Sequence, residues 1–346
     1  MTRYSVIEAD IQRNEDDILR ILKENLTGPS QKRYEWNYKQ CPYGFAHCWL
    51  VRHEESGSFI GTAALFPRMI FVNGEPVLTA IAGDFAVDKQ HRNLRPALAL
   101  QKEIIHDTRF KFVYSIPNEQ SKGILLRIGF KKIGSYVRFI KPLKSEYKSR
   151  QYLYSFLRYN ILARAADIVI KGFAQESRYK TTVPYSIEIP EYFDDRFTLF
   201  WKNLSKQSII IGEKTPDFLN WRYGQSPEQN YEIFCLLDGH KEIMGYCVYF
   251  IEKNMCHIMD MVYKPSTEVL SLLLAEFSRF MRIKGAGSIS VYYMGGSLLE
   301  EKLQEFNFVP IMEEMNDVIL YCPDPADNPG LFKKENWHFF AGDNDV

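Results

Sequence analysis

The chain has 346 residues, more than one hydrophobic core usually accommodates, and this length predicts two domains. Apolar residues make up 46% and charged residues 25%, values that are typical of globular proteins and exclude a disordered chain. Basic and acidic residues balance at 43 each, so the bulk charge favours no nucleic-acid partner.

The sequence shows no sign of export, of a membrane span or of a metal site. Its first 26 residues are too charged for a signal peptide, and no apolar run approaches the ~20 residues that a membrane-spanning helix needs. We therefore expect a cytoplasmic protein. The cysteines form no CxxC pair and mostly lie in apolar runs, which predicts reduced core residues and no metal ligands. They are Cys41, Cys48, Cys235, Cys247, Cys256 and Cys322.

The first half of the chain predicts an α/β unit. Residues 48–65 have the pattern of two strands joined by a polar turn, and residues 80–87 that of a third, apolar strand that carries Asp84. A helix beginning near Pro96 follows. A strand over residues 110–116 and a second helix, closed by a Gly-Phe turn, complete the unit.

The middle of the chain predicts a basic amphipathic helix. Apolar residues recur at helical spacing between Tyr147 and Gln175, beside several Lys and Arg residues. Such a helix can lie on an anionic membrane or can connect two domains by packing its apolar stripe, and we favour the connecting role. The expected organisation is an N-terminal domain over residues 1–145, a connecting helix over 146–180 and a C-terminal domain over 181–346.

The second half repeats the order of the first. Residues 235–250 again predict a hairpin, and the following strand again carries one acidic residue, Asp260. The interval from Asp84 to Phe130 nearly equals that from Asp260 to Phe308. We therefore predict two tandem copies of one α/β (α+β) unit, each a mixed, mainly antiparallel sheet flanked by helices, with one right-handed parallel β-α-β step.

Two short motifs in the first half point to a family. Val87, His91 and Arg92 follow the central strand, and a second motif runs from Asn118 to the Gly-Phe turn. With the order of elements, they resemble the GNAT acyltransferase superfamily, whose members transfer an acyl group from acyl-coenzyme A to an amine. The segments "TPDFLNWRYGQSPEQNYEIF" and "NWHFFAGDNDV" also resemble tandem GNAT-type proteins associated with bacterial surface polysaccharide synthesis.

The resemblance implies a coenzyme site with acetyl-CoA or another short acyl-CoA as co-substrate. The family's phosphate loop has Arg or Gln, then Gly, then Gly or Ala, where this chain has Arg92, Arg95 and Ala97. Free N–H groups at the start of the helix attract phosphate, although a solvated basic turn is the alternative. Backbone groups of the splayed central strand would bind the pantetheine arm. The expected coenzyme-binding residues are Phe85, Val87, Arg92, Asn93, Leu94, Arg95, Pro96, Ala97, Asn118 and Ser121, the last two with helix capping as an equal alternative.

Acyl transfer also needs a base for the attacking ammonium and an acid for the departing thiolate. Asp84 is the candidate base, and the acidic residue recurring at Asp260 leaves a structural role open. The tyrosine that many family members use as the acid is replaced by Leu125, so Tyr114 on the neighbouring strand is the substitute.

The second half lacks the phosphate-loop motif. Glu268 places a negative charge in the first turn of its helix, which repels a phosphate, so we expect no coenzyme there. This half would instead help to build the acceptor cleft. Residues that either line that cleft or serve packing are Trp221, Arg222, Tyr223, Trp337, His338, Asp343 and Asp345.

The leading hypothesis is an N-acyltransferase acting on the amine of a small metabolite, with an amino sugar or sugar nucleotide as the expected acceptor and a homodimer as an option. One alternative is a Fem-type transferase that uses aminoacyl-tRNA, which the neutral charge disfavours. The other is a non-catalytic scaffold, which the absent loop glycine and the absent tyrosine favour.

Overall fold

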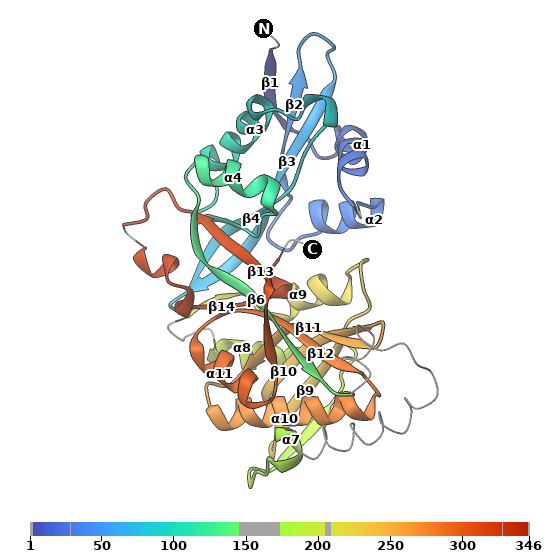
Figure 1. Ribbon diagram of the computed structural model, residues 1–346, viewed down its shortest axis with the longest axis vertical. Coiled ribbons are helices and arrows are strands. Elements are labelled where there is room, and N and C mark those ends of the chain that lie inside the picture. Colours follow the sequence, from blue (N-terminus) through green and yellow to red (C-terminus); the bar gives the residue numbers. More distant parts are fainter. Residues whose placement is uncertain (1–2, 28, 145–173, 205–208, 327, 345–346) are drawn as a thin grey trace.

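The computed structural model describes residues 3–27, 29–144, 174–204, 209–326 and 328–344. The expected connecting helix therefore lies almost entirely outside the described residues. In the described part of the chain the strands form one continuous 14-stranded sheet (Figure 1). The helices lie on its faces, so the predicted mixed α/β architecture is confirmed.

The N-terminal half starts with a strand and two helices and then follows the order expected from the sequence. Its strands and helices are β1 (Tyr4–Ala9), α1 (Glu15–Asn25), α2 (Gln31–Tyr34), β2 (His47–His53), β3 (Phe59–Val72), β4 (Glu75–Val87), α3 (Leu94–His106), β5 (Val113–Ser115), α4 (Glu119–Arg127) and β6 (Lys131–Pro142).

The C-terminal half begins with short elements, repeats the same order and adds a last strand. Its elements are α7 (Gln175–Arg178), β7 (Tyr185–Glu188), α8 (Asp195–Leu204), β8 (Ile210–Gly212), α9 (Pro216–Leu219), β9 (Glu232–Asp238), β10 (Ile243–Glu252), β11 (Met255–Tyr263), α10 (Thr267–Ile283), β12 (Ser288–Gly295), α11 (Ser297–Glu305), β13 (Val309–Tyr321) and β14 (Trp337–Phe340).

The two halves also match in strand register. β4 pairs with β5 in parallel, as does β11 with β12, so the expected parallel step occurs in both. Gly61 lies opposite Val87 and Gly245 lies opposite Tyr263. A Cβ on Gly61 would come within 2.8 Å of the Ala86 carbonyl oxygen, which explains the glycine at this position of β3.

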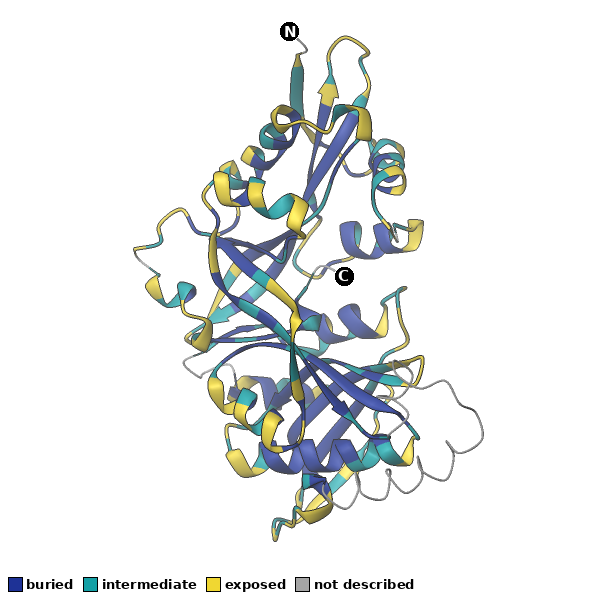
Figure 2. Cartoon of the chain, in the orientation of Figure 1, coloured by how far each residue is buried: buried dark blue, intermediate teal, exposed yellow. Residues whose placement is uncertain are grey.

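Each half contributes the strand that follows its second crossover helix, β6 or β13, to the sheet of the other half. β6 pairs with β12 along Tyr293 to Ser288, and β13 lies between β5 and β6. The register of β13 against β6 shifts between Ile311 and Asn316, where the strand is exposed (Figure 2). The sequence does not indicate this exchange, which joins the two halves in one sheet.

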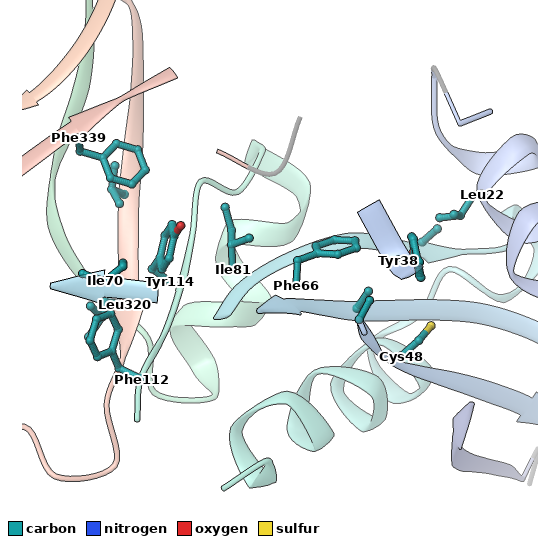
Figure 3. Packing of buried hydrophobic residues seen from close by; sticks show 14 of the residues in the cluster. Leu22, Tyr38, Cys48, Phe66, Ile70, Ile81, Phe112, Tyr114, Leu320 and Phe339 are labelled. Carbon is teal, nitrogen blue, oxygen red and sulfur yellow. The ribbon is translucent and has the colours of Figure 1, made fainter. Parts of the chain in front are cut away.

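Part of the sheet closes into a barrel-like ring. Its strands run in the order β3, β4, β5, β13, β6, β12, β14 and β8, and β8 pairs again with β3. Phe66, Ile81, Tyr114, Leu320 and Phe339 belong to the buried cluster of this region (Figure 3). The ring therefore has a packed interior.

Helices cover both faces of the N-terminal strands (Figure 1). Alternate side chains of β2 point to opposite faces: Leu50 packs in the cluster that contains Leu22 of α1, and Val51 packs with Leu100 of α3. α1 and α3 therefore sandwich this part of the sheet, and the candidate site lies between them.

The cysteines occupy the core, as predicted. All six are buried and free, and burial raises the pKa of the Cys48 thiol to about 12. In the described ranges no three His, Cys, Asp or Glu side chains are grouped as a metal ion would require. None of the described helices combines the length and apolar character needed to cross a membrane.

Candidate active site

A groove opens where β4 leaves β5. The two strands pair in parallel only around Ala80 and Ile81, and the Ser115 hydroxyl then donates to the Ala82 carbonyl at 3.1 Å. β4 continues to Val87 with no strand on this side among the described residues. Asp84 has a φ of 47°, in the left-handed region, next to a register shift against β3. The strand therefore bulges and turns backbone groups toward the gap.

Two adjoining cavities fill the gap, and each has a volume of about 310 Å³. The outer groove, between the end of β4 and the starts of α3 and α4, is lined by eight of the ten expected coenzyme-binding residues: Phe85, Val87, Arg92, Asn93, Leu94, Ala97, Asn118 and Ser121. The inner cavity shares Leu26, Phe85, Asn118 and Ser121 with it and continues to Ala82, Asp84, Gln101, Ile104 and Leu125.

The start of α3 differs from the expectation. The helix begins at Leu94 with Asn93 as its N-cap, so Pro96 lies in the first turn instead of at the first position. The Asn93 side chain accepts from the Arg95 N–H at 3.1 Å, and the Asn93 N–H donates to the His91 carbonyl at 2.7 Å. Pro96 has no N–H. Leu94 thus provides the remaining free N–H of this turn, and the helix start is a poorer phosphate site than the sequence suggested.

The two arginines of the loop have different surroundings. Arg92 lines the outer groove, where its Nε donates to the Val87 carbonyl at 3.0 Å and its Nη2 to Asn25 Oδ1 at 3.2 Å. It therefore ties the end of β4 to α1. Arg95 is exposed and, like the buried Pro96, lines neither cavity.

Asn118 and Ser121 both line the groove and cap α4. The Asn118 side chain accepts from the backbone N–H groups of Gln120 and Ser121, at 3.1 and 2.9 Å, and from the Ser121 hydroxyl at 3.0 Å. The capping role and the groove position thus occur together, as the sequence allowed.

Asp84 is held by a bidentate ion pair. Arg33 of α2 donates to its two carboxylate oxygens at 2.8 and 3.1 Å, and the Tyr38 hydroxyl donates at 2.8 Å. The Asp84 side chain is 7% exposed and lines the inner cavity. A carboxylate has about four acceptor positions, so the three bonds leave one of them for another donor.

The structure does not bring Tyr114 to the groove. Its ring is buried in the barrel against Phe339, and its hydroxyl donates to the Asp343 carbonyl at 2.9 Å (Figure 3). Leu125, at the family's tyrosine position, does line the inner cavity. The described residues around that cavity carry hydroxyl groups at Thr27, Ser115 and Ser121.

Arg33, Gln101 and Glu228 are among the inner-cavity residues that were not identified from the sequence. Arg33 lies on α2, before the segment in which the sequence analysis recognised the repeat, and Glu228 comes from the other half of the chain, so the predicted repeat reveals neither residue. Gln101 had a signal, because it is a polar residue on the apolar face that α3 forms with Ala97 and Ile104.

The corresponding gap of the C-terminal half is occupied by its own chain. β11 and β12 stop pairing after Ile258, and β14 then lies along β12. The His338 Nε2 atom of β14 lies 2.8 Å from the Met261 carbonyl of β11, which makes Nε2 the protonated nitrogen. β14 thus bridges the two strands. Beside β14, a cavity of about 260 Å³ remains between the end of β11 and the starts of α10 and α11, the positions that correspond to the outer groove of the first half.

His338 should make stability depend on pH. Burial lowers its pKa to about 4, from an ordinary value of 6.5. As the pH falls, the unfolded chain takes up a proton on His338 at a higher pH than the folded chain does. The contribution of the neutral ring to the free energy of unfolding is therefore complete above pH 6.5 and is lost as the pH falls toward 4. For this partly exposed ring we expect a loss of about 2 to 3 kcal/mol in the free energy of unfolding. Urea denaturation between pH 7 and 4 measures it.

A variant without a titrating group at position 338 separates the effect of His338 on stability from that of other groups that titrate in acid. His338→Gln keeps a donor for Met261 and should flatten the decline between pH 6.5 and 4. His240→Gln, on an exposed turn, should leave it unchanged. An equally steep decline in His338→Gln would contradict the assignment.

The sequence left two roles open for a group of aromatic and charged residues, lining an acceptor cleft or packing. In the structure most of them serve packing. Trp221, Arg222, Tyr223, Trp337 and Asp343 are all buried, and Asp345 lies outside the described residues. Asp343 belongs to an internal charge cluster in which Lys214 Nζ lies 2.7 Å from Asp260 and 2.9 Å from Asp343. The recurring acidic residue Asp260 is therefore structural in this half.

The described residues form a mixed α/β fold with splayed strands and crossover helices, and this fold matches solved structures of GNAT-type N-acyltransferases. Comparison with family models and with curated proteins finds no match. A probable N-acyltransferase of unknown function from Enterococcus faecalis superposes with a TM-score of 0.66 at 13% identity, over 93% of this chain and 73% of that one.

Two further structures extend the likeness. A GCN5-related N-acetyltransferase from Kribbella flavida gives a TM-score of 0.60 at 13% identity, over 93% of this chain and 72% of that one. Saccharomyces cerevisiae N-myristoyltransferase with bound myristoyl-CoA gives 0.55 at 13% identity, over 92% and 79%. The likeness concerns the fold, and it covers both halves of this chain.

Proposed function

We propose that this protein is an acyl-CoA-dependent N-acyltransferase that binds acetyl-CoA or another short acyl-CoA in the outer groove. The observation that carries the proposal is the splay of β4 from β5, which leaves backbone groups of β4 facing a groove lined by eight residues expected at the coenzyme. Such preorganised N–H groups can bind the pantetheine arm and polarise the thioester carbonyl.

In the proposed reaction, the amine nitrogen attacks the thioester carbonyl carbon. A carbon–nitrogen bond forms, the carbon–sulfur bond breaks, and coenzyme A leaves as a thiolate that takes up a proton. The nitrogen's proton passes to Asp84, directly or through a water, because this carboxylate lines the inner cavity. Tyr114 has no part in this scheme, since its hydroxyl is bonded inside the barrel.

The C-terminal half, as a second copy of the GNAT unit, would form the acceptor side. Two observations support this role: β14 lies along β12 in the gap that corresponds to the coenzyme groove, and Glu228 enters the inner cavity from this half. A carboxylate at the mouth of the cavity attracts an ammonium group. The acceptor would be the amine of a small metabolite, with an amino sugar or sugar nucleotide as the first compounds to test.

Acetyl-CoA should stabilise the protein against heat. At a concentration 100-fold above Kd, a ligand that binds only the folded state adds about 2.7 kcal/mol. Arg92→Glu should abolish the rise in Tm, because it reverses the charge beside the groove and breaks the bond to Val87. Differential scanning fluorimetry measures both effects.

The matched control is Arg127→Glu, an identical charge reversal at an exposed position near the end of α4. It should keep the acetyl-CoA shift. The absence of a shift with every short acyl-CoA in the unmodified protein would overturn the proposed function and favour the non-catalytic scaffold.

A further inference from the structure

Gln101 has a buried side-chain oxygen with no hydrogen-bond partner among the described residues. The residue is 2% exposed on α3, and its Oε1 atom is buried without a hydrogen bond. Its amide forms no hydrogen bond to any described residue, and the side chain lines the inner cavity. An unpaired buried amide costs about 1 to 3 kcal/mol. Its position beside a cavity therefore points to a ligand group that pairs with it.

Gln101 reaches the inner cavity from α3. With Ala82, it stands beside Ile104 and Leu125, which belong to the apolar cluster beneath α3 and α4. The lining residues Arg33 and Glu228 come from α2 and from the C-terminal half. The lining of the cavity thus combines apolar residues of the N-terminal unit with charged residues from α2 and from the C-terminal half.

The outer groove and the inner cavity follow one another along α3. Ala97 lines the outer groove, and Gln101 and Ile104 line the inner cavity on the same helix face. At 1.5 Å per residue, Gln101 lies about 6 Å and Ile104 about 10 Å further along the helix than Ala97. A thioester whose phosphates lie at the start of α3 therefore directs its acyl group toward Gln101.

Resting on the acyltransferase function proposed above, we infer that the transferred acyl group is short and carries a hydroxyl group that hydrogen-bonds to the Gln101 amide. A hydroxyl both donates and accepts, so it satisfies either orientation of this amide. A carboxylate cannot donate to the buried Oε1. Ile104 and Leu125, backed by the cluster around Leu100, close the cavity to a long chain.

Binding of coenzyme A thioesters to the full-length protein tests the inference without knowledge of the acceptor. Isothermal titration calorimetry would compare butyryl-CoA with 2-, 3- and 4-hydroxybutyryl-CoA. We expect one hydroxybutyryl-CoA to bind about tenfold more tightly than butyryl-CoA, the factor that corresponds to one buried hydrogen bond. Gln101→Leu should remove this preference and keep butyryl-CoA binding, because the change leaves an apolar cavity of similar size.

The control is Gln304→Leu, the same change at an exposed position of α11, which should keep the preference. Equal binding of all four thioesters to the unmodified protein would overturn the hydroxyl inference and leave the acyltransferase proposal standing. Binding of none of them would overturn the acyltransferase proposal itself. Because the unmodified protein decides both questions, the test does not depend on the folding of a variant.

Discussion

Asp84→Asn should lower kcat at least about 100-fold, the lower range for loss of a general base. Asparagine has nearly the same shape and tolerates the left-handed φ of 47° at this position, but its amide cannot take a proton. The loss should appear in turnover while acetyl-CoA still raises Tm. The measurement is amine-dependent release of the coenzyme A thiol, with an acceptor chosen from a panel of amino sugars.

Tyr38→Phe provides the comparison for this effect. It removes one hydrogen bond to the Asp84 carboxylate and leaves the ion pair with Arg33 intact, so we expect a smaller loss of turnover than in Asp84→Asn. Circular dichroism checks that both variants are folded, because the carboxylate also neutralises a nearly buried guanidinium. If folded Asp84→Asn keeps most of its turnover, Asp84 is a structural residue and not the base.

Lys214→Met should lower the free energy of unfolding by about 3 to 5 kcal/mol, as removal of one partner from a buried ion pair does. Lys214 is 2% exposed and lies between the carboxylates of Asp260 and Asp343. Burial lowers the pKa of Lys214, but the two carboxylates outweigh it and hold the pKa above its ordinary value. Methionine would leave two buried acidic groups without a cation, and urea denaturation would measure the cost.

Lys39→Met is the matched control, because Lys39 also bridges two carboxylates, those of Glu15 and Glu35. Its side chain is 17% exposed, so water screens the pairs and the expected cost is about 1 kcal/mol or less. The double variant Lys214→Met, Asp260→Asn should be less destabilised than Lys214→Met alone, since it removes one of the uncompensated charges. Equal costs for Lys214→Met and Lys39→Met would show that the internal cluster has no special importance.

Local patterns in the chain were sufficient to predict the elements of the repeated segment, from the hairpin to the second helix of each half, and their order. Apolar periodicity identified the strand that carries Asp84 and the helices after it, because side-chain spacing along one segment reflects that segment's own geometry. The resemblance to the GNAT superfamily predicted that Phe85, Val87 and Asn118 lie together at a coenzyme site. In the structure all three line the outer groove. These residues lie within a single βαβα unit, so the chain order already limits their separation.

Long-range pairing was beyond the reach of local patterns. The side-chain alternation of β6 and β13 is compatible with pairing in the sheet of either half. Contacts with strands distant in the sequence decide which strand each one pairs with, so the sequence analysis did not predict their exchange. The same reason applies to β14, which lies along β12 in the second gap, and to Arg33 and Glu228, which reach the inner cavity from separate elements. The start of α3 at Leu94 depended on which side chain capped it.

The chain order thus specifies a repeated α/β unit with a basic turn before its first crossover helix. Folding in three dimensions makes the two units different, because tertiary contacts leave the groove beside Phe85 open and place β14 in its counterpart. Local hydrogen bonding also weakens the basic turn as a phosphate site. The side chain of Asn93 and the ring of Pro96 leave few free N–H groups at the start of α3. Both outcomes depend on which backbone and side-chain groups, distant in the sequence, form hydrogen bonds with one another. The pattern of residues along one segment does not contain that information.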